Sequence, residues 1–272
     1  METGNLSGTS MRAEQDSMGI IEVPDNCYWG AQTQRSLHYF AIGNDQFPPE
    51  FIRAFAQVKK AAARTNQALG KLDDARADLI ATTCDELLQG HLADQFPLSV
   101  WQTGSGTQTN MNLNEVIANR ANERAGQPRG SKSPVHPNDH VNLSQSTNDA
   151  FPTAMHLAAL NQIQQELLPA LTELRAGLAA RASAFDSIVK IGRTHLMDAT
   201  PLTLGQEFSA WVAQLDSAKH NIDQAVEPLL EVAMGGSAVG TGLNTHPDYA
   251  VTVAPFLAQV SGHPIRTTGN KF

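Results

Sequence analysis

Two long apolar seams constrain the fold of this 272-residue chain more than any other feature. Within 153–182, and again within 203–233, apolar residues recur every three or four positions, which is the spacing of one helical face. The first seam comprises Leu160, Ile163, Leu167, Leu171, Leu174 and Leu178, and the second comprises Phe208, Trp211, Leu215, Ala218, Ile222, Ala225 and Leu229. Helices of this length pack along one another in bundles, with kinks or interruptions expected at Pro169 and Pro228.

The remaining helical signals are shorter. The spacing predicts helices over 49–70, 73–90, roughly 111–125 and roughly 247–261, with a polar segment at 126–139. Two long helices and one short one leave more apolar seam than a closed bundle can bury. We therefore expect partner helices from other subunits, from sequence outside this chain, or from both.

Charge and cysteine content exclude several classes of protein. A net charge of −8 without a basic cluster disfavours nucleic-acid binding, and no apolar run is long enough to span a membrane. The two cysteines, Cys27 and Cys84, form no C-x-x-C pair, which argues against a disulfide framework, a zinc knuckle and an iron–sulfur cluster. A reducing cytoplasm is the expected compartment.

Three polar loops next to helices carry the candidate chemistry. "TGSGTQTNMNLNEV" (103–116) offers glycines, backbone N–H groups and the hydroxyls of Ser105 and Thr107 at the start of a helix, where anions bind well. It lacks the strand and lysine of a phosphate loop, so nucleotide binding is disfavoured. A simpler interpretation is a capped loop, with Thr109 or Asn110 as the N-cap.

The second loop is the run Ser144–Gln145–Ser146–Thr147–Asn148–Asp149, which holds more polar residues than one helix cap requires. The third, 191–208, places His195 between Thr194 and Asp198, as a tuned acid or base or as a buried structural histidine. The glycine-rich stretch 235–250 reads as a structural turn. Together the loops offer many neutral donors and few cations, which suits the oxygens of a carboxylate ligand.

Four stretches resemble class II fumarate hydratase of the aspartase/fumarase superfamily. They are "GSGTQTNMNLNEVIANRAN", "HPNDHVNLSQSTNDAFPTAMHLA", "GRTHLMDATPLTLGQEF" and "GGSAVGTGLNTHPDYA", and the match begins near Arg12. Aspartate ammonia-lyase is the nearest alternative, and "SQSTND" suits both enzymes. The pair Thr194-His195, where that enzyme has Thr-Gln, and the sequence "HPND" favour the fumarase.

The resemblance implies a mostly α fold: a tail over 1–11, an N-terminal domain over 12–145, and the first part of a long-helix central bundle over 146–272. It implies reversible hydration of fumarate to L-malate without a metal or other cofactor, in a homotetramer whose active sites are shared among subunits. His195 would be catalytic. The residues implied to bind substrate are Ser105, Gly106, Thr107, Ser146, Thr147, Asn148 and Thr194.

The resemblance also implies a second, peripheral carboxylate site at His136, Pro137, Asn138 and Asp139. The family often has an arginine three residues before this histidine. Here the position is Ser133, and Arg129 or Lys132 are candidate substitutes.

One family signature does not occur in these residues: the Gly-Ser-Ser-x-x-Met-Pro-Gly-Lys-x-Asn-Pro loop, which carries a serine base and a substrate-binding lysine and asparagine. We therefore expect the chain to correspond to about the first three-fifths of a fumarase and to be inactive alone. A non-catalytic helical assembly module is the alternative of another class.

Overall fold

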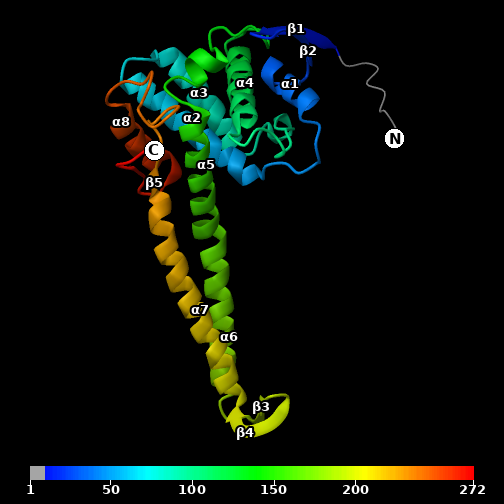
Figure 1. The fold of residues 1–272 in the computed structure, drawn as a ribbon, viewed down its shortest axis with the longest axis vertical. Helices are drawn as coiled ribbons and strands as arrows, with labels where there is room; N and C mark the ends of the chain where they lie inside the picture. Colours follow the sequence, from blue (N-terminus) through cyan, green and yellow to red (C-terminus); the bar gives the residue numbers. More distant parts are fainter. Residues whose placement is uncertain (1–9) are drawn as a thin grey trace. The chain divides into compact units, whose positions relative to one another are not determined.

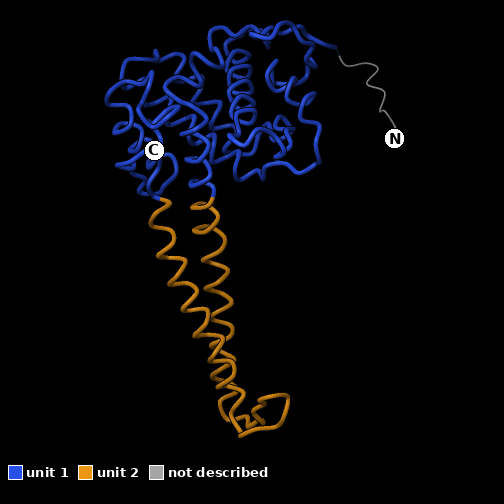
Figure 2. The backbone as a smooth tube through the Cα atoms, viewed as in Figure 1, with its two compact units in different colours: residues 1–158, 230–272 blue, residues 159–229 orange. Residues whose placement is uncertain are grey.

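The computed structural model describes residues 10–272, which form two compact units (Figure 1, Figure 2). Residues 10–158 and 230–272 make the first unit, and residues 159–229 make the second. Both are mainly helical, so the expected mostly α fold with long helices is confirmed. No helix in this described part is long and apolar enough to cross a membrane.

The core of the first unit surrounds α2 (Pro49–Ala68), which packs against α3 (Asp74–Leu88) and α8 (Tyr249–Ser261). Phe55, Val58 and Ala62 of α2 are fully buried, as the helical spacing predicts. Asp73 begins α3 by accepting a hydrogen bond from the N–H of Arg76 at 2.9 Å. These three helices agree with the predicted ranges to within about two residues.

The helix α4 (Thr107–Arg124) starts four residues earlier than predicted. Its N-cap is Gly106, so the assignment of Thr109 or Asn110 as N-cap is wrong. Gly106 has φ +74°, and an added Cβ would lie 2.2 Å from the ring of Phe151. Because only glycine tolerates both the left-handed backbone and this contact, the turn closes at Gly106. Thr109 and Asn110 therefore lie inside the helix, where both are buried.

Short strands and turns complete the first unit. The antiparallel pair β1 (Met11–Asp16) and β2 (Gly19–Pro24) precedes α1 (Ala31–Tyr39), and β5 (Glu231–Val232) pairs in parallel with β6 (Arg266–Thr267). The expected tail falls mainly on residues 1–9, which lie outside the described residues, while Met11 already belongs to β1. A π-helical turn (Pro137–Val141) leads to α5 (Thr147–Gln162), at whose end the second unit begins.

The second unit is a helical hairpin. A π-helical turn (Ile163–Leu167) continues into α6 (Leu168–Ala184), which packs beside α7 (Leu204–Val226). Pro169 follows the π-helical turn and Pro228 lies in a 3-10 helix (Glu227–Leu230), so both prolines mark interruptions as predicted. The antiparallel strands β3 (Val189–Thr194) and β4 (Met197–Thr203) join the two helices, where the sequence indicated only a polar turn.

The compact units divide the chain inside α5 and after α7, whereas the predicted domains meet at 145/146. The units differ from the predicted domains because α8 packs back onto α2. The domain assignment 12–145 and 146–272 stays a prediction.

Candidate functional site

A polar pocket of about 490 Å³ lies in the first unit, where the starts of α4 and α5 meet the glycine-rich loop that follows β5. Its lining residues are Thr107, Asn110, Met111, Asn142, Ser144, Gln145, Ser146, Thr147, Asn148, Ser237, Ala238, Leu243 and Asn244. Ten of these thirteen side chains carry a hydroxyl or carboxamide, and none is charged. The pocket therefore offers neutral hydrogen-bonding groups, as the polar loops predicted.

Two helix starts contribute to the same pocket. Thr107 is the first residue of α4 and Thr147 is the first residue of α5, and both line it. The first N–H groups of a helix have no partner within the helix and carry partial positive charge. Two such ends in one pocket favour an anion over a neutral or cationic ligand.

The buried carboxylate of Asp149 joins the polar run to the glycine-rich loop. One oxygen accepts a hydrogen bond from the N–H of Ser146 at 2.9 Å, and the other accepts from Gly235 at 3.0 Å and Ser237 at 2.9 Å. Burial raises the pKa of Asp149, and these N–H groups oppose that rise. Asn148 adds a hydrogen bond from its side-chain N–H₂ to the carbonyl of Ala238 at 2.7 Å. The loop at 235–244, read from sequence as a structural turn, thus also lines the pocket.

The hydroxyl of Ser237 is the one buried group in this lining that lacks a hydrogen-bond partner within residues 10–272. Ser237 is only 6% exposed, and its φ of +52° places it in the left-handed region. A buried hydroxyl without a partner costs free energy, as does a non-glycine residue in this conformation. Both costs are typical of a site that binds a ligand.

The Gly-Ser-Gly-Thr turn lies at the edge of the pocket. Thr107 belongs to the lining, and the hydroxyl oxygens of Ser105 and Thr107 are 2.9 Å apart. Ser105 also lies 3.3 Å from the hydroxyl oxygen of Thr103. Of the predicted substrate-binding residues, Thr107, Ser146, Thr147 and Asn148 therefore line one pocket, and Ser105 and Gly106 directly precede Thr107 in the turn.

Beneath the pocket lies a buried cation that sequence reasoning missed. The ammonium of Lys59 on α2 is fully buried and donates to the carboxamide oxygens of Asn110 at 2.7 Å, Asn142 at 3.0 Å and Gln145 at 3.0 Å. Burial lowers the pKa of Lys59 to about 7, and the nearby carboxylate of Asp149 opposes that fall. The sequence does contain a signal for this buried lysine: Lys59 lies on the apolar face of α2, one turn after Phe55, where a lysine is unusual.

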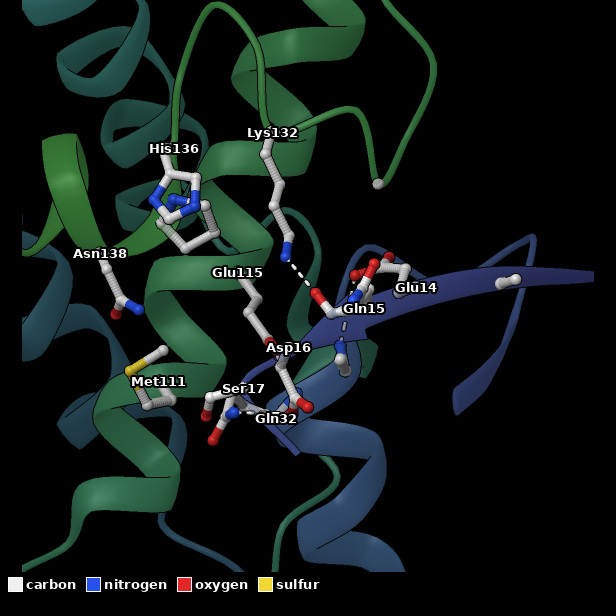
Figure 3. Close-up of a pocket in the computed structure, with 14 residues that line it drawn as sticks. Glu14, Gln15, Asp16, Ser17, Gln32, Met111, Glu115, Lys132, His136 and Asn138 are labelled. Atoms are coloured by element: carbon white, nitrogen blue, oxygen red, sulfur yellow. Dashed lines mark hydrogen bonds between the residues drawn. The ribbon is translucent and has the colours of Figure 1, made fainter. Parts of the chain in front are cut away.

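A second pocket of about 630 Å³ contains three of the four residues predicted for the peripheral carboxylate site. Figure 3 shows His136 and Asn138 on one side and β1 on the other, with Lys132 reaching the backbone carbonyl of Gln15. Pro137 also lines this pocket, but Asp139 does not; its carboxylate lies 3.4 Å from Nδ1 of His136.

Lys132 is the candidate substitute for the missing arginine that lines this second pocket. Arg129 lies elsewhere, because it donates to Glu123 and to the carbonyl of Asp25, each at 2.8 Å. The pocket also contains acidic side chains, of which Asp16 forms an ion pair with Arg35 at 2.9 Å. Among the described residues no group of three or more histidine, cysteine, aspartate or glutamate side chains is arranged to hold a metal ion.

Thr194 and His195 belong to the second unit. They lie at the turn of the β3–β4 hairpin, where His195 and Leu196 have φ values of +49° and +62°. Both Thr194 and His195 are exposed in the single chain. The choice between a tuned acid or base and a buried structural histidine at His195 therefore stays a prediction. Neither residue is among those that line the two pockets of the first unit.

The sequence model of a lyase family matches residues 19–272. The chain belongs to this lyase family. It is 58% identical over 261 residues to the class II fumarate hydratase of Neisseria meningitidis, a match that covers 96% of this chain and 56% of that protein. It is 59% identical to a class II fumarate hydratase of Pseudomonas aeruginosa, with the same coverage. The chain thus spans about 56% of the length of the curated relatives it matches.

Solved structures give the same result for the lyase family. The chain superimposes on a class II fumarase from Schistosoma mansoni with a TM-score of 0.94 and 40% identity, over 97% of this chain and 58% of that one. A fumarate lyase:delta crystallin from Brucella melitensis gives a TM-score of 0.93 and 43% identity, over 96% and 57% of the two chains. The resemblance drawn from the sequence motifs is confirmed.

Proposed function

We propose that the protein carrying this chain is a fumarate hydratase, which catalyses the reversible hydration of fumarate to L-malate in the tricarboxylic acid cycle. The polar pocket would bind the substrate carboxylates. One observation carries this proposal: neutral donors and two helix starts converge in one pocket, beside the buried, unpartnered hydroxyl of Ser237. The identity of 58–59% to class II fumarate hydratases supports it.

The pocket suits the chemistry of this reaction. To convert malate to fumarate, a base must take a proton from the carbon next to a carboxylate, and negative charge then accumulates on that carboxylate until the hydroxyl group of the neighbouring carbon leaves as water. By the family resemblance this base is the serine of the signature loop that does not occur in these residues. Fixed hydrogen-bond donors stabilise such charge, and the loss of one donor typically lowers turnover by about 10²–10³-fold. We assign this binding to Ser105, Gly106, Thr107, Ser146, Thr147 and Asn148, with Thr194 contributed by the hairpin of another subunit.

We assign transfer of the proton of the water or hydroxyl group to His195. Its imidazole is exposed at the turn of the hairpin, and histidine is the side chain best suited to proton transfer near neutral pH. No step of this assignment uses a metal or an organic cofactor. We further propose that His195 acts in a site shared among subunits.

A homotetramer would cover the apolar seams of the second unit. No residue of α6 is buried, and Gly205 is the only buried residue of α7. Leu174 and Trp211 are 56% and 41% exposed. Apolar seams of this length are normally buried in a bundle, and other copies of the same chain would supply the missing helices.

The second pocket is our candidate for a peripheral dicarboxylate site, with Lys132 in place of the usual arginine beside His136 and Asn138. Both cysteines of the chain, Cys27 and Cys84, are free and buried, which fits a reducing cytoplasm.

The test joins these 272 residues to the remaining C-terminal part of the Neisseria meningitidis relative. The purified chimera should form a tetramer by light scattering and should produce fumarate from L-malate but not from L-aspartate. Within it, His195→Asn should lower turnover by roughly 10²–10⁴-fold, the usual effect of losing a general acid or base. His136→Asn, in the second pocket, is the matched control and should leave turnover near that of the unsubstituted chimera.

Fumarate production from aspartate alone would identify an aspartate ammonia-lyase. A folded tetramer without either activity would favour an assembly module. Exchanged effects of the two histidine substitutions would overturn the assignment of the two sites.

A further inference from the structure

The three N–H groups of the Lys59 ammonium are all committed to carboxamide oxygens. They donate to Oδ1 of Asn110, Oδ1 of Asn142 and Oε1 of Gln145, at 2.7–3.0 Å. An ammonium has three donors and no acceptor, so it can bind these carboxamides only through their oxygens. Each carboxamide is therefore held in one orientation, with its N–H₂ group directed away from Lys59.

The fixed orientation of the Asn110 carboxamide determines which hydrogen bonds it makes at the pocket. Its N–H₂ group donates to the hydroxyl oxygen of Thr147 at 3.1 Å and to Oδ1 of Asn142 at 3.2 Å. A threonine hydroxyl can donate one hydrogen bond and accept others. Because Asn110 already donates to this oxygen, the hydroxyl proton of Thr147 remains available to a ligand in the pocket.

The carboxamide of Gln145 donates to two backbone carbonyl groups. Its N–H₂ group donates to the backbone carbonyls of Val141 at 2.8 Å and Leu143 at 3.2 Å. Asn66 on α2 also donates to the carbonyl of Leu143, at 3.0 Å. These carbonyl oxygens are therefore hydrogen-bonded within the protein, and the N–H₂ group of Gln145 is committed to them.

We propose that Lys59 is a positioning residue that sets the hydrogen-bond polarity of this pocket, so that it presents donors and selects a carboxylate over a carboxamide of the same shape. The inference rests on the proposed function for the identity of the ligand, but not for the arrangement around Lys59. The ammonium also places a buried positive charge beneath a pocket whose lining is neutral. In a region of low dielectric constant, such a charge attracts an anion more strongly than it would in water.

The groups that surround Lys59 come from α2 itself and from α3, α5 and α8. Asp149 on α5 and the Cys84 thiol on α3 both favour the charged ammonium, while burial disfavours it. Tyr249 on α8 is fully buried and interacts with Asp149. The ring of Phe55 lies 5.2 Å from the ammonium and favours its charged form through a cation–π contact.

The first experiment needs no ligand. Side-chain amide signals of Asn110, Asn142 and Gln145 are followed by NMR in the 272-residue chain as the pH is raised from 5 to 9. We expect the three signals to change together near the pKa of Lys59, which is about 7. The shared transition should persist in Lys60→Met and vanish in Lys59→Met. Lys60 is the matched control, because it is the next residue of α2 and pairs with Asp85 at 2.6 Å.

The second experiment titrates fumarate and its uncharged analogue fumaramide into the same chains. Lys59→Met should weaken fumarate binding by about tenfold or more, the effect of losing hydrogen bonds made by a charged group. It should leave fumaramide binding unchanged or stronger, and Lys60→Met should behave like the wild type. Thr147→Val removes the hydroxyl that accepts from Asn110 and should weaken fumarate binding. In the double variant with Lys59→Met it should weaken binding little further, because both substitutions disrupt the same hydrogen-bonded chain.

The first experiment tests whether Lys59 positions the carboxamides, and the second tests whether it makes the pocket select a carboxylate. If the three amide signals do not share a transition, or if Lys59→Met retains it, the positioning role is wrong. If Lys59→Met does not fold, the shared transition in the wild type tests the positioning role, and the fumarate titration of Thr147→Val tests the role in selectivity. Equal weakening of fumarate and fumaramide binding by Lys59→Met would also overturn the role in selectivity. If the 272-residue chain alone binds no fumarate, the same titrations are made in the chimera described above. If the shared transition is present but the chimera binds no fumarate either, the proposed function fails and the arrangement around Lys59 stands.

Discussion

Single residues decide how the pocket of the first unit is built. Gly106 allows α4 to begin next to Phe151, Ser237 leaves a buried hydroxyl without a partner, and Lys59 holds three carboxamides from below. Each depends on a neighbour far away in the sequence. The sequence motifs identified Thr107 and residues 146–148, which line the pocket, and Ser105 and Gly106, which directly precede Thr107, but none of these motifs includes Lys59.

At Gly106, substitution tests whether the turn needs glycine. Gly106→Ala combines a left-handed backbone at φ +74° with a Cβ only 2.2 Å from Phe151. We expect it to lower the free energy of unfolding by about 2–4 kcal/mol, from backbone strain together with overpacking. The matched control is Gly126→Ala, where φ is +77° and nothing lies within 4 Å of the added atom. It should cost about 1 kcal/mol. Equal effects in urea denaturation would mean that contact with Phe151 does not constrain the turn.

The pKa of Lys59 predicts a pH dependence of stability. It is about 7 in the folded chain and 10.5 in an unperturbed lysine. Between these values the unfolded chain binds more protons, so unfolding becomes less favourable as pH rises. Stability of the wild type relative to Lys59→Met should therefore increase from pH 7 to pH 10, by at most about 1.4 kcal/mol per pH unit. Urea denaturation at several pH values measures this difference, and a flat or falling difference would contradict the lowered pKa.

Among the elements, periodicity predicted the long helices better than it predicted the connections. The ranges of α2, α3 and α8 follow from apolar spacing and from residues such as Pro49 and Asp73 at their starts. The β3–β4 hairpin was missed, because its strands carry mostly exposed side chains and show no alternation of buried and exposed positions. The early start of α4 was missed because it depends on Phe151, which is distant in the sequence.

The connection between α5 and the glycine-rich loop gives a prediction at this scale. Asp149→Asn keeps the shape of the side chain but replaces a carboxylate that accepts three backbone hydrogen bonds. One acceptor oxygen becomes an N–H₂ donor facing N–H groups, so we expect a loss of about 2–3 kcal/mol in stability. Faster hydrogen exchange should appear at the amides of Gly235 and Ser237.

Asp139→Asn is the matched control, since the side chain of Asp139 is 73% exposed. It should leave stability and exchange unchanged. If both variants exchanged at the wild-type rate throughout 235–238, Asp149 would not hold the loop against α5.

At the scale of the whole molecule, the two compact units carry different parts of the proposed enzyme. The first unit contains the polar pocket, while the second contains the exposed seams of α6 and α7 and the hairpin with His195. The class of lyase could be predicted from the motifs, because several long stretches match in order. Which copies of the chain meet around one site could not, because apolar spacing predicts that a helix is buried without indicating its partner.

The central claim is that the pocket formed by the starts of α4 and α5 and the 237–244 loop binds a dicarboxylate. The most direct test titrates fumarate into the isotopically labelled 272-residue chain and follows the backbone amide signals by NMR, with chloride at equal ionic strength as the control. We expect saturable changes at Thr107, Ser146, Thr147, Asn148 and Ser237 that chloride does not produce. Saturable changes confined to Lys132 and His136, or no change beyond the chloride control, would contradict the claim.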